Sequence, residues 1–237
     1  PEFEIPQRWI VTEKIDGTNV RVSLEYDECG KGEEHECKAA WAVRFYGRTS
    51  NAQMPTFLLE YLQRTFTLEK MQDLWRGKKD CPLCGVPAEA WPFGRGHSNV
   101  VQPYFKCPCS DPYPIVLYGE GYGAKIQKGG GNYRRDGDVS FRLFDVLIGE
   151  TWLALQDVQD VARRLEVATV QRIEAANGEL LTTQDIVEYV RIGLTSIVAE
   201  QEGTKGTIAE GVVAFTNPPL FNGRGQRLMW KLKTKDF

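Results

Sequence analysis

The chain has no surplus of positive charge. Its 29 lysines and arginines stand against 32 aspartates and glutamates, which gives a formal net charge of −3. A global basic field that attracts nucleic acid is therefore excluded, and any nucleic-acid surface must be local. The sequence also lacks an apolar run long enough to span a membrane and a visible signal peptide, so we expect a soluble, cytoplasmic or otherwise intracellular protein.

The 237 residues, of which 42% are hydrophobic, can bury a substantial core. We expect one domain over residues 1–237, with residues 77–114 as an insert, because periodicity disappears there and prolines, glycines and cysteines accumulate. The first residue is proline rather than methionine, so we expect a trimmed or processed chain.

A short segment around Lys14 carries the first sign of chemistry. An apolar run predicts a strand that brings Lys14 into a partly buried position. Asp16-Gly17 is typical of a turn, and residues 20–24 alternate like a returning strand, which together predict a β-hairpin. A lysine on a rigid hairpin beside a carboxylate is a candidate nucleophile, and a solvated surface lysine is the alternative.

A lysine attacks only as the free amine, whereas an unperturbed lysine side chain, with a pKa of about 10.4, is protonated near pH 7. Asp16 would favour the ammonium form. A nucleophile at this position therefore needs a nearby cation, either another lysine or the divalent metal that accompanies ATP.

The sequence Lys14-Ile15-Asp16-Gly17 resembles motif I of the covalent nucleotidyltransferases, which include ATP-dependent DNA ligases, RNA ligases and mRNA capping enzymes. Asn19, two residues after Gly17, resembles the pattern of the RNA ligase branch, whereas DNA ligases and capping enzymes more often carry arginine nearby. The resemblance implies that Lys14 is the nucleophile and that Glu13, Ile15 and Asn19 bind the nucleotide.

Two later segments extend the resemblance. Arg48 follows a predicted strand at 39–45, where RNA ligases carry a phosphate-binding arginine; an ordinary turn arginine is the alternative. Glu120 ends a predicted strand at 115–119 and takes the motif III position, whose carboxylate contacts the nucleotide ribose. The glycine-rich run after it is not a Walker loop, because no Gly-Lys-Ser/Thr closes it. It is either a phosphate-binding loop or a mobile surface loop, with a local basic cluster of Lys125, Lys128, Arg134 and Arg135.

Phe144 lies in a predicted strand at 140–148, and Phe144-Asp145 matches the Phe-Asp pair of the family. The resemblance implies that the ring stacks on adenine. From the residues alone, a core phenylalanine is the preferred interpretation of Phe144.

Motifs IV and V complete the resemblance. Glu210, at a predicted strand over 209–215, resembles the glutamate that helps hold magnesium or manganese. Lys231 and Lys233 alternate on one face of a strand at 228–233. They are either a solvated face or the motif V lysines that reach the ATP α-phosphate and supply the cationic field near Lys14.

Helical spacing predicts a helix that opens at Pro55 and Thr56, continues to residue 75 and buries an aromatic stripe. It also predicts helices over 155–170 and 183–201, with Thr182 or Thr183 as a cap. We interpret all of these helices as packing elements.

Cys81, Cys84, Cys107 and Cys109 form two close pairs that match a zinc ribbon or knuckle, with His97 as a substitute ligand. Such a zinc is structural, because four protein ligands leave no open position. Free thiols or disulfides are the alternatives, and this insert departs from the ligase family. Cys29, His35 and Cys37 form a weaker group. A second metal site there would need a fourth ligand from Glu33, Glu34 or Glu36, and we interpret the two cysteines as unpaired thiols instead.

These motifs occur in the expected order and agree best with the family of the second RNA ligase of T-even phages and the RNA-editing ligases. The implied fold is an α+β nucleotidyltransferase domain whose antiparallel sheets form an ATP cleft, without the C-terminal domain that usually follows. The implied activity is ATP-dependent RNA ligation with magnesium or manganese, by a monomer acting on nicked RNA or RNA ends. A phage-encoded protein acting in a host cell fits this resemblance. A DNA ligase or capping-type guanylyltransferase, or a non-catalytic zinc-bearing nucleic-acid module, are the alternatives.

Overall fold

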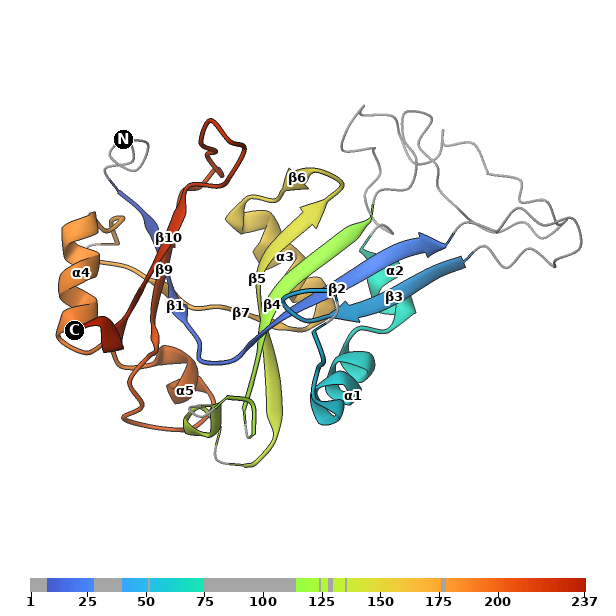
Figure 1. Ribbon diagram of the computed structural model, residues 1–237, viewed down its shortest axis with the longest axis horizontal. Coiled ribbons are helices and arrows are strands. Elements are labelled where there is room, and N and C mark those ends of the chain that lie inside the picture. The colour runs from blue at the N-terminus through green and yellow to red at the C-terminus, as the bar shows by residue number, and fades with distance from the viewer. Residues whose placement is uncertain are drawn as a thin grey trace, which may run out of the picture.

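The computed structural model describes residues 8–27, 40–50, 52–74, 114–123, 125–127, 130–134, 136–175 and 178–237. Two β-sheets lie side by side, with helices on the outer side of each (Figure 1). The predicted α+β class with antiparallel sheets is confirmed. Among the described residues, no helix is long and apolar enough to cross a membrane.

The larger sheet has six strands in the order β3-β2-β4-β5-β6, and β7 adds to β5 as a parallel neighbour. The strands are β2 (Thr18–Asp27), β3 (Ala40–Tyr46), β4 (Ile115–Gly123), β5 (Val139–Ile148), β6 (Thr151–Trp152) and β7 (Ala168–Thr169). Helices α1 (Thr56–Thr65), α2 (Leu68–Asp73) and α3 (Leu155–Leu165) cover one face of this sheet.

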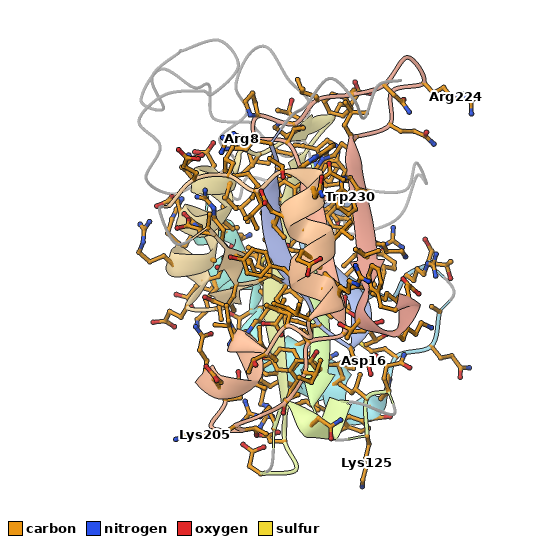
Figure 2. The ribbon with its side chains drawn as sticks, turned by 90° about the vertical axis from the view of Figure 1, so that its left-hand side faces the viewer. Arg8, Asp16, Lys125, Lys205, Arg224 and Trp230 are labelled. Atoms are coloured by element: carbon orange, nitrogen blue, oxygen red, sulfur yellow. The ribbon has the colours of Figure 1, made fainter. Side chains whose placement is uncertain are left out.

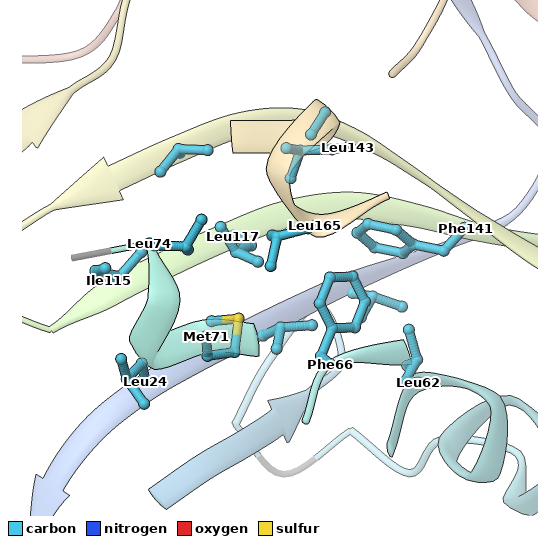
Figure 3. Packing of buried hydrophobic residues seen from close by; sticks show 14 of the residues in the cluster. Leu24, Leu62, Phe66, Met71, Leu74, Ile115, Leu117, Phe141, Leu143 and Leu165 are labelled. Carbon is cyan, nitrogen blue, oxygen red and sulfur yellow. The ribbon is translucent and has the colours of Figure 1, made fainter. Parts of the chain in front are cut away.

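Alternation along the strands builds the main core. Val20, Val22 and Leu24 are fully buried on one face of β2, because successive residues of a strand point to opposite sides. They pack with Leu62 of α1, Met71 of α2 and Phe66, which lies between these two helices (Figure 3). The helices do not cover the opposite face of β2 and β4.

The smaller sheet has the order β10-β9-β1-β8. Its strands are β1 (Ile10–Lys14), β8 (Arg172–Ile173), β9 (Gly211–Phe215) and β10 (Met229–Lys233). Helix α4 (Thr183–Arg191) covers its outer face, where Trp9, Val11 and Ala214 are buried against the helix. Figure 2 looks onto α4 and shows Trp230 beside it. The inner face of the small sheet is turned toward the large sheet (Figure 1).

The predicted hairpin around Asp16-Gly17 is wrong. β1 pairs with β8 and β9, whereas β2 pairs with β3 and β4, so the two strands belong to different sheets. The chain crosses between the sheets at Gly17, where a Cβ atom would lie 2.4 Å from the Gly121 carbonyl oxygen. Alternation predicted both strands correctly, but it carries no information about which strand each one pairs with.

Three predicted helices end earlier than expected. The first breaks at Phe66, and Thr67 caps a separate α2 by accepting a hydrogen bond from Lys70 N. The third divides into α4 and α5 (Ile197–Gln201), because Gly193 has a φ of +88° and Ser196 caps α5. The second ends at Leu165, and residues 168–169 form β7.

The predicted cap of α4 is confirmed, since Thr182 and Asp185 form a capping box. In the predicted aromatic stripe, Leu58, Leu62 and Met71 are buried, but Phe57 is 38% exposed. The insert at 77–113, Cys29, His35 and Cys37 lie outside the described residues, as do the predicted zinc ligands Cys81, Cys84, Cys107 and Cys109.

Candidate active site

The strand register of the small sheet brings two of the predicted lysines together. Lys14 on β1 is paired with Gly211 on β9, which is in turn paired with Lys233 on β10. Residues that are directly opposite each other in antiparallel strands point to the same face. Gly211 leaves that face open between the lysines, and a Cβ atom there would come within 2.0 Å of the Leu232 carbonyl oxygen.

Glu210 bridges the two lysines. Its Oε2 accepts a hydrogen bond from Lys14 Nζ, and its Oε1 accepts one from Lys233 Nζ at 2.5 Å. Burial by itself would raise the pKa of Glu210, but the hydrogen bonds from both lysines outweigh burial and leave this pKa below its usual value. The bond to Glu210 also raises the pKa of Lys233. The three side chains form a compact cluster of alternating charge.

Lys231 lies on the same face, one row further along β10, and is exposed. Its row continues through Val213 and Thr12 to Arg172 on β8. Arg172 is a cation that the sequence analysis missed, because β8 is only two residues long and shows no periodicity. Its Nε lies 3.0 Å from Glu174 Oε1.

Glu120 faces this cluster from the large sheet. It is paired with Asn19 on β2, so both lie on the face that the helices leave uncovered. Burial raises the pKa of Glu120 to about 7, the positive charge of Lys14 lowers it, and the charges of Glu210 and Asp16 raise it. Lys14, Glu210 and Asp16 therefore all lie within electrostatic range of Glu120.

The side chains of Glu13 and Ile15 point away from this cluster. Glu13 is 2% exposed, and its carboxylate accepts hydrogen bonds from Ser196 Oγ and from Val198 N at 3.0 Å. Burial, only partly offset by those bonds, raises the pKa of Glu13. Ile15 is 3% exposed and packs against Tyr122 and Tyr133. A nucleotide contact from either residue would come from backbone atoms, not from the side chains that the sequence singled out.

Two of the four residues of the predicted basic cluster, Lys125 and Arg134, are described, and they have different surroundings. Lys125 is exposed and projects from the lower edge of the molecule in Figure 2. Arg134 is held by carboxylates, because it pairs with Asp136 and, at 2.7 Å, with Glu202. Lys128 and Arg135 lie outside the described residues. Arg48 lies exposed in the bend after β3, as predicted for a turn or phosphate-binding arginine.

A β-bulge re-aims Phe144. Tyr118 is paired with Asp145 and Gly119 with Leu143, so Phe144 is the extra residue on β5. Phe144 and Asp145 both line a cavity of about 10 Å³. Phe215 at the end of β9 and Arg227 in the segment between β9 and β10 also line it. That volume suits one water molecule and not a purine, so stacking on adenine would require the cavity to open.

The amino-acid sequence also matches a known protein family. The family model described as RNA ligase matches residues 7–232.

The chain belongs to the RNA ligase family.

This RNA ligase family member resembles solved structures of Naegleria gruberi RNA ligase. A mutant of that ligase with ATP and Mn has a TM-score of 0.56 at 15% identity, and the match covers 100% of this chain and 52% of that chain. The same ligase with PPi has a TM-score of 0.54 at 16% identity, covering 97% of this chain and 50% of that one. The chain thus spans about half the length of these structures. No curated protein sequence matches it significantly.

The structure of this family member also contains a polar network that the sequence analysis missed. Tyr122 Oη donates to Glu202 Oε1 at 2.5 Å and accepts from Arg142 Nε at 3.0 Å. Arg142 is 3% exposed, and burial raises the pKa of Tyr122 to about 12. The residues are far apart in sequence and belong to no short motif. Arg142 alternates with the core residues Phe141 and Leu143, so the sequence pattern alone predicts a solvent-facing arginine and gives no sign of its burial.

Proposed function

We propose that this chain is the nucleotidyltransferase domain of an ATP-dependent RNA ligase. It forms a lysyl-AMP on Lys14, passes AMP to an RNA 5′-phosphate and seals that end to a 3′-hydroxyl. The observation that carries the proposal is the Lys14–Glu210–Lys233 cluster on adjacent strands. Family membership and the likeness to a ligase solved with ATP and Mn support it. Asn19 beside Glu120 supports the T-even phage and RNA-editing ligase branch.

In the first step, Lys14 Nζ attacks the α-phosphorus of ATP. A nitrogen–phosphorus bond forms, the bond to the pyrophosphate oxygen breaks, and Nζ loses a proton to water as pyrophosphate leaves. Before it attacks, Lys14 must leave the ammonium pair with Glu210 and give one proton to solvent, which leaves the free amine. Lys233, on the same face, stabilises the negative charge of the reacting phosphate, as preorganised cations do in phosphoryl transfer.

Glu210 is the residue that would hold magnesium or manganese, and bound metal would neutralise phosphate charge. Its hard carboxylate oxygens suit either ion. Within the described part of the chain, no group of three His, Cys, Asp or Glu side chains can hold a metal ion alone. The remaining ligands would therefore be ATP phosphates and water, as is common for Mg²⁺. Once engaged with metal, Glu210 would release Lys14 as a nucleophile.

The later steps use the same face. An oxygen of the RNA 5′-phosphate attacks the AMP phosphorus, and the nitrogen–phosphorus bond breaks to restore Lys14. A 3′-hydroxyl then attacks the 5′-phosphorus, loses its proton and displaces AMP. We propose that Glu120 and Asn19 bind the ribose of AMP, and that Phe144 and Arg48 contact adenine and phosphate. We further expect a requirement for ribose at the 3′-hydroxyl end, where the 2′-hydroxyl distinguishes RNA from DNA.

The decisive experiment is mass spectrometry of the protein incubated with ATP and Mg²⁺ or Mn²⁺. Wild type should gain the mass of one AMP, and Lys14→Ala should not. Lys205→Ala is the matched control, because Lys205 is exposed at the lower edge of the molecule (Figure 2). GTP is offered separately to test the guanylyltransferase alternative. Wild type without an adduct, or an adduct in Lys14→Ala, would refute the assignment.

We also propose one structural zinc bound by Cys81, Cys84, Cys107 and Cys109. The paired spacing supports this proposal, and binding would contribute folding free energy to the insert. Elemental analysis of protein purified without chelator should find one zinc per chain. Protein with all four cysteines intact and no zinc would remove the proposal.

A further inference from the structure

The candidate nucleophile Lys14 and the proposed ribose-binding residue Glu120 belong to different sheets. Lys14 ends β1 of the small sheet, and Glu120 lies on β4 of the large sheet. Catalysis in the proposed function needs Lys14 and the ribose-binding Glu120 at a fixed separation, because misplacement by about 1 Å can cost a hundredfold in rate. Strand pairing does not fix the distance between Lys14 and Glu120, because β1 and β4 belong to different sheets and no ladder joins them.

Helix α5 contacts β1 directly beside Lys14. At the start of α5, Ser196 Oγ and Val198 N both donate to the carboxylate of Glu13, the residue that precedes Lys14. Ser196 also accepts from Ala199 N at 2.9 Å and so caps the helix. Ser196 is fully buried and Glu13 nearly so, which makes this a buried polar contact between α5 and β1.

The residue that follows α5 contacts the large sheet directly beside Glu120. The Glu202 carboxylate accepts from Tyr122 Oη at 2.5 Å, from Arg134 Nη1 at 2.7 Å and from Arg142 Nη2 at 3.4 Å. Tyr122 lies two residues after Glu120 on β4, and Arg142 is the cross-strand partner of Glu120 on β5. Glu202 therefore holds both neighbours of Glu120.

A small apolar cluster fills the space between these two groups of hydrogen bonds. Val198 and Ala199 of α5 pack against Ile15, Tyr122 and Tyr133. Tyr133 Oη also accepts a hydrogen bond from Asp16 N at 3.2 Å, which holds the segment that crosses between the sheets. This buried apolar cluster therefore lies between the hydrogen bonds of Glu13 and those of Glu202.

We propose that α5 is a brace that sets the position of Lys14 relative to Glu120, and that Tyr122 and Glu202 are positioning residues for lysyl-AMP formation. Their side chains bond to each other and to Arg142. They act through the buried network that joins α5 to β4 and β5. This inference rests on the proposed function and adds residues that the family motifs do not include.

Single-turnover measurement of AMP adduct formation distinguishes a positioning role of these residues from a role in folding alone. Each chain can carry one AMP, so the final amount of adduct counts competent molecules, whereas the rate constant at saturating ATP reports the geometry. The first variant is Tyr122→Phe, which keeps the buried ring and removes only the hydroxyl. The second is Glu202→Gln, which keeps the shape and removes the charge. Glu200→Gln is the matched control, because Glu200 is exposed on the same helix.

We expect Tyr122→Phe to reach the full wild-type amount of adduct with a rate constant about tenfold lower, and Glu202→Gln to be slower still. The ATP concentration for half-maximal rate should stay within about threefold, and Glu200→Gln should match wild type. A full amount of adduct at the wild-type rate in Tyr122→Phe would overturn the proposal. So would a reduced amount formed at the wild-type rate, which indicates a folding role alone. Wild type that forms no adduct would instead refute the proposed function, and the inference would fall with it.

Discussion

Replacing Glu120 by glutamine should change how the stability of the protein depends on pH. Burial raises the pKa of Glu120 from 4.5 to about 7. The folded state therefore binds this proton more tightly than the unfolded state does. Stability from the protonated form is complete below pH 4.5 and is lost as the pH rises toward 7. At about 1.4 kcal/mol per pH unit, a difference of roughly 2.5 pH units corresponds to about 3 kcal/mol.

Urea unfolding of wild type and Glu120→Gln between pH 4 and 8 measures this contribution, with chelator present and nucleotide absent. Other groups also titrate in this range, so the useful quantity is the difference in unfolding free energy between the two proteins at each pH. Glutamine stays neutral, so Glu120→Gln should gain about 3 kcal/mol relative to wild type from pH 4 to pH 8.

Two further variants test the cause of the raised pKa. Lys14→Met removes the positive charge that lowers the pKa of Glu120, so the change with pH should become larger. Asp16→Asn removes a negative charge that raises it, so the change should become smaller. A difference between wild type and Glu120→Gln that is constant with pH, or that runs in the opposite direction, would refute the reasoning.

Three other outcomes follow from the structure. Lys233→Met should slow AMP adduct formation about tenfold or more, because Lys233 shares Glu210 with Lys14, and rapid-quench sampling with labelled ATP measures the rate. Arg227→Met should cost about 3 kcal/mol in urea unfolding, since it strands Asp145 in a nearly buried ion pair of 2.7 Å; Asp145→Asn in the same background should recover part of that loss. The chain should seal a pre-adenylylated nick better than a 5′-phosphate nick in a gel assay, because its net charge of −3 offers few contacts to phosphates. Equal sealing of an all-DNA nick would favour the DNA ligase alternative.

Much of the site could be located from the sequence because its motifs are local. Lys14, Glu120, Glu210 and Lys233 were all expected near a nucleotide, and the structure brings them into one electrostatic cluster. The cation that Lys14 needs was expected from the motif V lysines, and Lys233 is indeed beside it through Glu210.

Other residues could not be placed this way. The sequence alone marks Glu13 as part of motif I, yet its carboxylate lies on the opposite face and binds Ser196, a residue 183 positions away. Phe144 depends on a bulge, which changes the register by one residue and leaves no trace in a pattern of alternating hydrophobicity.

The sequence by itself determined which residues alternate, where Thr182 caps a helix, and which side chains are candidates for the chemistry, because these properties depend on neighbours within a few positions. Only the tertiary structure decided that β1 and β2 part into different sheets, that Glu210 lies between two lysines, and that α5 joins Glu13 to Tyr122. Strand pairing and buried polar contacts are chosen among all distant partners at once, by packing and by the cost of leaving a buried polar group unpaired.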